Sequence, residues 1–138
     1  MCKLLTLLFI FCELSIFSFA QEKAIVASNK KVYLKTKPNI TFCDKTEGYI
    51  LLNSLLNAKN ILMPNAYTLK SVSIYIGGGK GYSEPVIATL AGNSLSALTK
   101  IFKRCSEGTR IVFMNIKILK DNIIYDAPDI NFIVKEKL

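Results

Sequence analysis

The clearest hydrophobic pattern in this chain is a two-residue alternation in its second half. Residues 69–76 place Val72, Ile74 and Ile76 on one face, and the other face carries Ser71, Ser73 and Tyr75. This period predicts a strand with one buried face. Residues 85–91 and 130–134 predict two more strands. The second half of the chain is therefore predicted to be mainly β.

The stretch between residues 92 and 119 predicts a helix followed by a long strand. An apolar stripe of Leu95, Leu98 and Phe102 favours one short α-helix over about residues 93–104, with Asn93 or Ser94 as its cap. Gly108 ends this segment, and residues 109–119 are apolar on both sides, as in an interior strand. Strict alternation predicts that one face of this strand carries four residues: Val112, Met114, Ile116 and Ile118. Ile111, Phe113 and Leu119 would then share the other face with Asn115 and Lys117.

The first half has weaker signals. Residues 24–34 and 38–43 have the composition of short strands, and 49–52 predicts a strand that leads into a helical turn or a loop through residues 55–56. Pro64-Asn65 predicts a turn. Asp121-Asn122, between two apolar segments, predicts a hairpin.

The N-terminus has the pattern of a signal peptide. Lys3 precedes an apolar run, and residues 18–20 read Ser-Phe-Ala, which suits cleavage after Ala20. The run is short for a membrane span and contains Glu13. We therefore expect residues 1–20 to be removed, leaving a single domain at 21–138 that is periplasmic or secreted and is not stably inserted in a membrane.

The chain is basic, with 18 Lys and Arg against 10 Asp and Glu, a net charge of +8. These cations are spread out and lack the dense clusters with interleaved aromatics that are typical of nucleic-acid surfaces. No nucleic acid partner is therefore expected. Two readings stay open: a solvated basic face, or a surface for an acidic protein or an anionic part of the cell envelope.

Two cysteines, Cys43 and Cys105, remain after the predicted cleavage. In an oxidising compartment they are candidates for a disulfide. A bridge across a loop of about sixty residues would stabilise the fold by roughly 4 kcal/mol in the chain-entropy model. The alternative is a pair of buried free thiols, which behave as small apolar side chains.

Catalytic chemistry is not indicated. The chain has no histidine, and most of its carboxylates fall at predicted turns. Residues 77–81, Gly-Gly-Gly-Lys-Gly, lack the spacing of a phosphate-binding loop and favour a turn with positive φ or a mobile loop. Asp121, Asp126 and Asp129 lack the spacing of a calcium loop. No catalytic residue, cofactor or metal site is predicted.

One stretch carries a family resemblance. The order KSVSIYIGGG, AGNSLSALTKIFKRCSEGTRIVFMNIKIL and DINFIV resembles the C-terminal domain of GldM, the gliding-motility and type IX secretion protein of Bacteroidota. The similarity centres on the predicted helix and on residues 108–117, and it covers about half of the expected mature chain. The resemblance implies an immunoglobulin-like β-sandwich in the periplasm that contacts other envelope components. Together with the predicted signal peptide and the missing catalytic groups, the resemblance leads us to expect a stand-alone, exported, non-enzymatic protein-binding domain with type IX secretion components among its partners.

Six residues are candidates for partner binding: Tyr75, Lys80, Tyr82, Lys100, Lys103 and Arg104. The lysines and the arginine would supply a basic surface. The alternative function is a secreted small-molecule or glycan-binding module, in which exposed Tyr75 and Tyr82 and the glycine loop form a platform. The oligomeric state stays open.

Overall fold

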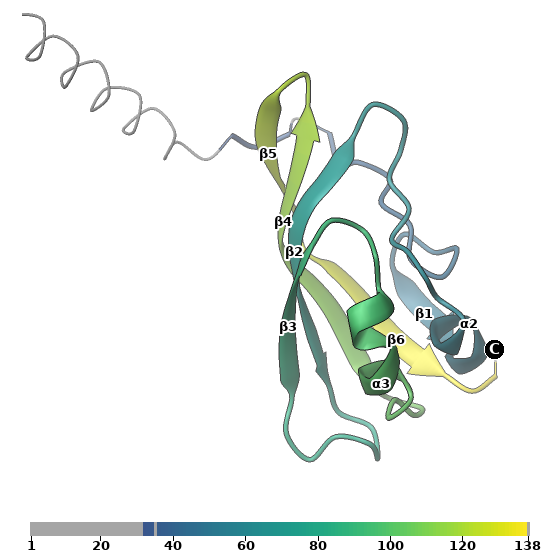
Figure 1. Ribbon diagram of the computed structural model, residues 1–138. Coiled ribbons are helices and arrows are strands. Elements are labelled where there is room, and N and C mark those ends of the chain that lie inside the picture. Colours follow the sequence, from purple (N-terminus) through teal and green to yellow (C-terminus); the bar gives the residue numbers. More distant parts are fainter. Residues whose placement is uncertain (1–31, 35, 138) are drawn as a thin grey trace, which may run out of the picture. The chain divides into compact units, whose positions relative to one another are not determined.

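The computed structural model describes residues 32–34 and 36–137 (Figure 1). The predicted signal peptide and residues 24–31 of the first predicted strand region lie outside the described residues. At the start of the described part, Tyr33 forms a parallel bridge to Asp126, and the amide of Asp126 donates to the carbonyl of Val32 at 2.9 Å.

The fold is mainly β, as predicted: 47% of the described residues are in strand and 11% in helix, consistent with a β-sandwich-like domain. Six strands of this part of the chain share one sheet. They are β1 (Gly48–Leu51), β2 (Thr68–Gly77), β3 (Val86–Ala91), β4 (Arg110–Lys120), β5 (Ile123–Ala127) and β6 (Ile130–Lys135). The strand order is β1-β6-β4-β2-β3, and β5 pairs with the second half of β4. Only the β1–β6 pair is parallel; the other described pairs are antiparallel.

The helices are short. The strand at residues 48–51 leads directly into α2 (Leu52–Leu56), as predicted. The predicted 93–104 helix is a 3-10 turn, η1 (Ser96–Leu98), followed by one α-turn, α3 (Thr99–Phe102). Its apolar stripe is buried as predicted. The predicted cap at Asn93 or Ser94 was wrong, because Leu95 occupies the cap position of η1 and no side chain caps it. The hydroxyl of Ser94 accepts a long hydrogen bond of 3.4 Å from the amide of Ser96.

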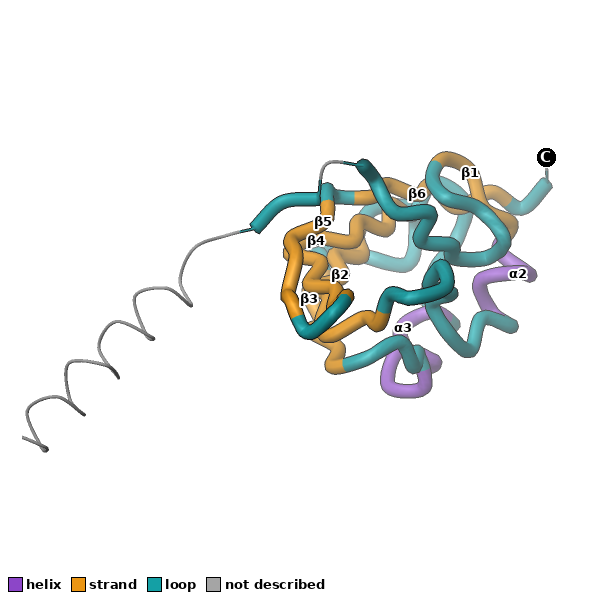
Figure 2. Tube along the Cα trace, turned by 90° about the horizontal axis from the view of Figure 1, so that it is seen from above, coloured by secondary structure: helices purple, strands orange, loops and turns teal. Residues whose placement is uncertain are grey.

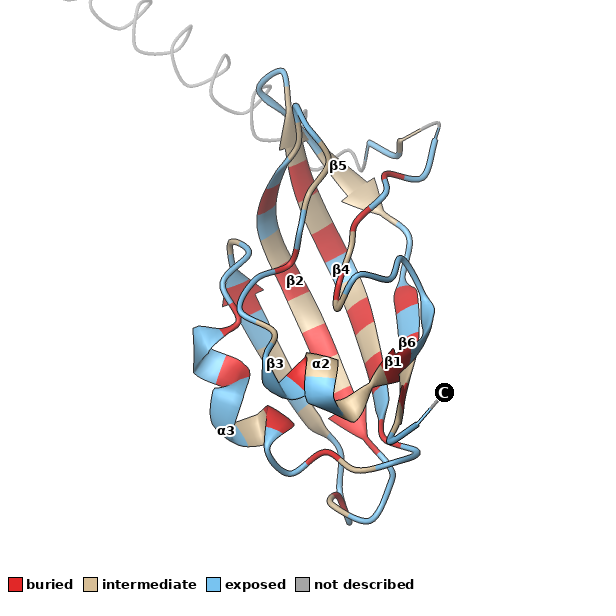
Figure 3. Ribbon diagram, turned by 90° about the vertical axis from the view of Figure 1, so that its right-hand side faces the viewer, coloured by how far each residue is buried: buried red, intermediate tan, exposed pale blue. Residues whose placement is uncertain are grey.

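The sheet curls, and its inner face holds the core. Figures 1 and 2 together show α2 and α3 on the same side of the sheet. In Figure 3 buried and less buried residues alternate along β2 and β4. Phe42, from the loop before β1, lies among Phe102, Phe113 and Phe132 at ring-centroid distances of 6.1, 5.1 and 5.3 Å. Because these four rings join the loop, the helix and two strands, they tie the layer over the inner face to the sheet.

Two bulges set which residues face inward. Between Leu69 and Ser71, β2 carries one extra residue relative to β4, and between Met114 and Lys117 the extra residue is on β4. Asn115 has φ 50° at this second bulge, in the left-handed region that asparagine tolerates better than most residues.

The bulge on β4 corrects the predicted faces of this strand. The buried residues are Ile111, Phe113, Ile116 and Ile118, so the inward side changes from odd to even positions at Asn115. The prediction that Val112 and Met114 share a face with Ile116 and Ile118 was wrong, because it assumed unbroken alternation.

Two tight hairpin turns have the same backbone form. Asp121 and Asn122 join β4 to β5 with φ values of 50° and 60°, as the sequence predicted. Cys43 and Asp44 have the same two values, between Phe42 and Lys45, which exchange backbone hydrogen bonds at 2.9 and 3.0 Å. Both central residues with positive φ are typical of a type I′ turn. The predicted turn at Pro64-Asn65 is also present, closed by the amide of Tyr67 bonded to the carbonyl of Pro64.

Candidate functional site

The outer face of the sheet carries an apolar strip. We use the name outer strip for the five residues Ile87, Tyr75, Val112, Met114 and Ile133. The pairing register places Ile87 and Val112 on either side of Tyr75, and Met114 opposite Ser73. Ile133, on β6, pairs with Arg110 and lies diagonally across from Val112, whose direct partner on β6 is Asn131. The outer strip thus crosses β3, β2, β4 and β6.

The outer strip is only partly covered. Ile87 is 64% exposed, and the other four members are half-buried, whereas their neighbours Ile74, Ile111 and Phe113 on the inner face are at most 1% exposed. Polar residues of the same face surround the strip: Ser73, Thr89, Arg110 and Asn131. A continuous apolar strip with a polar rim is typical of a surface that binds another protein.

Tyr82 is not the exposed platform that the sequence predicted. Its side chain is 5% exposed, and its hydroxyl donates to the carbonyl of Ile101. The guanidinium of Arg104 lies 4.7 Å from its ring centroid. Burial raises the pKa of Tyr82 to about 12. Tyr82 is therefore a packing residue that fastens the loop after β2 onto α3.

The glycine loop is held by the chain that follows α3. The amide of Lys80 donates to the hydroxyl of Ser106 at 2.9 Å, and Arg104 donates to the carbonyl of Gly81 at 3.3 Å. A Cβ on Gly81 would come within 1.7 Å of the carbonyl oxygen of Arg104. Gly78 and Gly79 have φ values of 76° and 65°, as expected for the turn reading of this loop. The glycines thus serve a close backbone approach.

The other predicted binding residues fall on two different surfaces. Lys100 and Lys103 are exposed on and just after α3, close in sequence to Arg104, which contacts the glycine loop that carries exposed Lys80. Tyr75 lies on the outer face, away from the buried side that contains Tyr82. Of these residues, the structure brings Arg104 to the glycine loop and to Tyr82, but it separates Tyr75 from Tyr82.

The two cysteines are free thiols in the structure, and the bridge that the sequence left open is not formed. Cys105 is buried, and its thiol has long contacts of 3.9 Å to the carbonyl of Ile101 and 4.0 Å to the hydroxyl of Tyr82. Burial raises the pKa of Cys105, an effect opposed by Tyr82 and Arg104. Burial, and then the carboxylate of Asp44, raises the pKa of Cys43 to about 12. Neither thiol is activated as a nucleophile.

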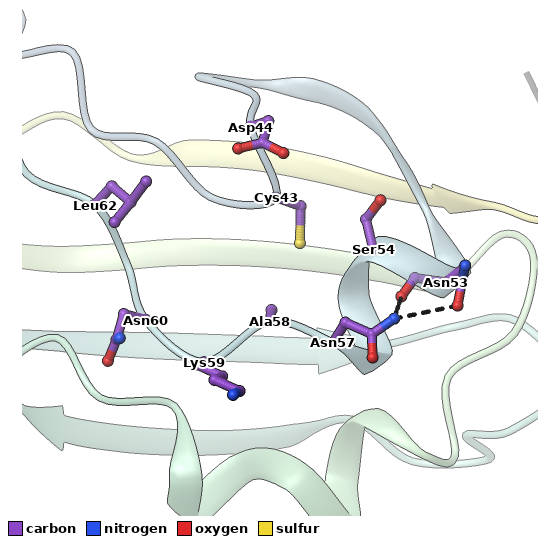
Figure 4. A pocket seen from close by; sticks show the side chains of 9 residues that line it. All are labelled: Cys43, Asp44, Asn53, Ser54, Asn57, Ala58, Lys59, Asn60 and Leu62. Atoms are coloured by element: carbon purple, nitrogen blue, oxygen red, sulfur yellow. Dashed lines mark hydrogen bonds between the residues drawn. The ribbon is translucent and has the colours of Figure 1, made fainter.

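A pocket of about 470 Å³ opens beside Cys43 (Figure 4). Its lining comes from the Cys43-Asp44 turn, α2 and the following loop; Asn53, Ser54, Asn57, Lys59 and Asn60 supply most of its polar groups. The side-chain nitrogen Nδ2 of Asn57 donates to the backbone carbonyl of Asn53 at 2.9 Å and to its side-chain oxygen Oδ1 at 3.3 Å. The pocket is open and polar. Its side chains offer hydrogen bonds, but among them no nucleophile is paired with a general base.

No group of three or more Cys, Asp or Glu side chains within 32–34 and 36–137 is arranged to hold a metal ion. Of the carboxylates, Glu47 pairs with Lys37 at 2.9 Å and Asp126 pairs with Lys117. In the same part of the chain, no helix has the length and apolar character needed to cross a membrane.

Sequence reasoning missed the outer strip. Its members alternate with core residues, but alternation alone does not tell which side of a strand will be covered. The bulge at Asn115 also concealed that Val112 and Met114 belong to the outer face, since it put them on a different face from Ile116. Asparagine inside an otherwise apolar strand was the available signal for a bulge.

Comparison with known proteins adds no relative to this picture. No protein-family model matches the chain, and no curated protein matches it.

Proposed function

We propose that this chain is a non-enzymatic, exported β-domain that binds another protein of the cell envelope through the outer strip. The observation that carries the proposal is the sidedness of the sheet. Helices and loops close the inner face, while Ile87, Tyr75, Val112, Met114 and Ile133 leave an apolar strip on the other. Such a strip gains free energy when a partner covers it, at roughly 25 cal/mol per Å² of apolar surface removed from water.

The place of action rests on sequence. The N-terminal pattern supports export to the periplasm or beyond. The resemblance of residues 69–134 to the C-terminal domain of GldM makes components of the type IX secretion and gliding machinery the first partners to test. The net charge of +8 favours a partner with acidic groups, because opposite charge speeds encounter.

The test compares capture of envelope proteins by three forms of the mature domain. The wild type and Ala97→Glu should retain one reproducible protein that Met114→Glu loses, because Met114 lies in the outer strip and Ala97 is exposed on η1. The captured protein, once purified, should form a stoichiometric complex with the wild type. Equal capture by Met114→Glu, or no reproducible capture by the wild type, contradicts the proposal.

The alternative of small-molecule or glycan binding is supported by a different feature from the one the sequence indicated. Tyr75 and Tyr82 do not form a common platform, but the pocket beside Cys43 gathers amide, hydroxyl and charged groups. A sugar or other polar ligand bound there would raise the unfolding midpoint of the wild type. The same ligand would act less on Asn57→Ala. A set of mono- and disaccharides that leaves the wild-type midpoint unchanged counts against this function.

A further inference from the structure

Strand β3 forms one edge of the sheet. Among the described helices and strands it contacts β2 alone. The amide of Gly92, just beyond β3, donates to the carbonyl of Lys70 at 3.1 Å. Because hydrogen-bonded and non-hydrogen-bonded pairs alternate in an antiparallel ladder, the amides and carbonyls of Ile87, Thr89 and Ala91 point away from β2.

These outward groups are unpaired within the described part of the chain. No backbone hydrogen bond or bridge from outside the ladder reaches residues 87–91. The side chains of the same three residues lie on the outer face, with Ile87 in the outer strip. The free edge and the outer strip are therefore one continuous surface.

The other edges of the sheet are better protected than β3. One flank of β5 is bridged by Tyr33 and bonded by Val32. The opposite edge of the sheet, β1, has four residues and runs straight into α2. By contrast, β3 has six residues, Val-Ile-Ala-Thr-Leu-Ala, with no charge, proline or glycine. Charged residues and proline are features by which proteins normally protect an open edge from pairing with another strand.

We infer that β3 pairs with an extended segment of a protein partner, which adds an antiparallel strand to the sheet beside Ile87, Thr89 and Ala91. This inference rests on the proposed function and specifies how the partner is held. Main-chain hydrogen bonds supply affinity in this mode, and alternate side chains supply specificity. The small residues Ala88 and Ala91 leave room for β-branched side chains opposite them.

Charge favours a different protein over a second copy of this chain. Each copy carries a net charge of +8, so two copies repel each other. The two ends of β3 differ in charge: exposed Lys70 lies on the neighbouring strand near Ala91, whereas Glu84 lies before Val86. A partner strand antiparallel to β3 has its N-terminal end beside Ala91. Acidic residues at that N-terminal end would therefore lie near Lys70 and far from Glu84.

A synthetic peptide tests this arrangement. The probe is acetyl-Glu-Glu-Val-Thr-Val-Thr-Val-amide, and its control carries Lys-Lys in place of Glu-Glu. We expect the Glu peptide to slow amide hydrogen exchange at Ile87, Thr89 and Ala91 by at least about tenfold, since each gains a hydrogen bond. Ala88 and Leu90, whose amides face β2, should change little. The Lys peptide should bind more weakly.

Two variants of one residue separate the backbone from the side chain. Thr89→Pro removes an outward donor and should weaken peptide binding about tenfold, whereas Thr89→Val keeps the amide and should bind like the wild type. Proline is tolerated on an edge strand when its position faces outward. If Thr89→Pro does not fold, Thr89→Lys at the same edge should weaken binding instead.

Three results overturn the inference. The first is no slowing of amide exchange at residues 87, 89 and 91, and the second is unchanged peptide binding by a folded Thr89→Pro. The third is amide exchange at these residues that becomes slower as the concentration of the domain alone is raised, which assigns the edge to a second copy.

Capture of envelope proteins separates failure of this inference from failure of the proposed function. If Met114→Glu loses the partner and Thr89→Pro keeps it, the outer strip binds and the edge does not. If the wild type captures nothing, the proposed function itself fails.

Discussion

The two faces of this sheet are built from the same strands and differ in what covers them. On the inner face, Ile74, Ile111 and Phe113 are at most 1% exposed, and Phe42 closes the layer above them. On the outer face, their direct neighbours Tyr75, Val112 and Met114 stay half-buried, and Ile87 is largely exposed. The stability of the fold therefore depends on the inner face, and the outer face is left free to bind.

The largest expected effect lies on the inner face. Phe42→Ala removes the ring that contacts three others, and it should lower the free energy of unfolding by about 3–5 kcal/mol. Urea unfolding followed by circular dichroism measures this loss. Phe42→Leu, which keeps most of the volume, should lose much less. A loss below about 1 kcal/mol for the alanine variant would show that this ring does not anchor the layer.

A matched pair on adjacent residues tests the comparison at a single point of β4. Ile111→Thr places a hydroxyl in the core and should cost about 2–4 kcal/mol. Val112→Thr keeps a β-branched side chain on the outer face and should change stability by less than about 0.5 kcal/mol. The same unfolding measurement serves both. Equal losses would mean that the outer face is also part of the core.

Gly81 tests how closely the glycine loop packs against the end of α3. Gly81→Ala forces a Cβ against the carbonyl oxygen of Arg104 and should cost about 1–3 kcal/mol. Lys80→Ala, in the same loop, is the control, because its exposed side chain should be nearly neutral. Thermal unfolding compares the two. If Gly81→Ala is as stable as the wild type, the loop is looser than its hydrogen bonds indicate.

The bulge at Asn115 decides which half of β4 faces which side. Asn115→Val puts a β-branched residue at φ 50° and should cost about 1–2 kcal/mol, while Asn115→Gly should be close to neutral. Unfolding midpoints of the two variants measure the difference. A valine variant as stable as the glycine variant would argue against a left-handed residue at this position.

The smallest expected effect is the dependence of stability on alkaline pH. An unfolded thiol ionises near pH 9, whereas burial holds the pKa of Cys43 at about 12 in the folded chain. The stabilisation is therefore complete below pH 9 and is lost as the pH rises toward 12, because the unfolded state releases its proton first. Cys105 and Tyr82 act in the same direction.

Cys43→Ala isolates the contribution of this one thiol to the loss of stability at alkaline pH. Unfolding midpoints measured at about pH 8 and about pH 10.5 should fall less in Cys43→Ala than in the wild type, because only the wild type carries the shifted group. An equal fall in both proteins would show that Cys43 is not desolvated.

Most of the β-structure could be predicted from local pattern. The sets Val72, Ile74, Ile76 and Ile130, Phe132, Val134 are buried as their alternation indicates. Ile116 and Ile118 could not be placed correctly, because a bulge changes the parity of a strand without changing its composition. Tyr82 was misjudged because its side chain is buried only through long-range contacts with Ile101 of α3 and with Arg104. The outer strip and the open edge of β3 depend on strand order, which local pattern does not determine.

A photo-crosslinking amino acid placed at position 114, and separately at position 97, in the native cell tests whether the outer strip binds a partner. We expect illumination to join the chain at position 114 to one envelope protein, because Met114 lies in the outer strip, and to give no such product at position 97 on η1. A product at position 97 together with none at position 114 would contradict binding through the outer strip.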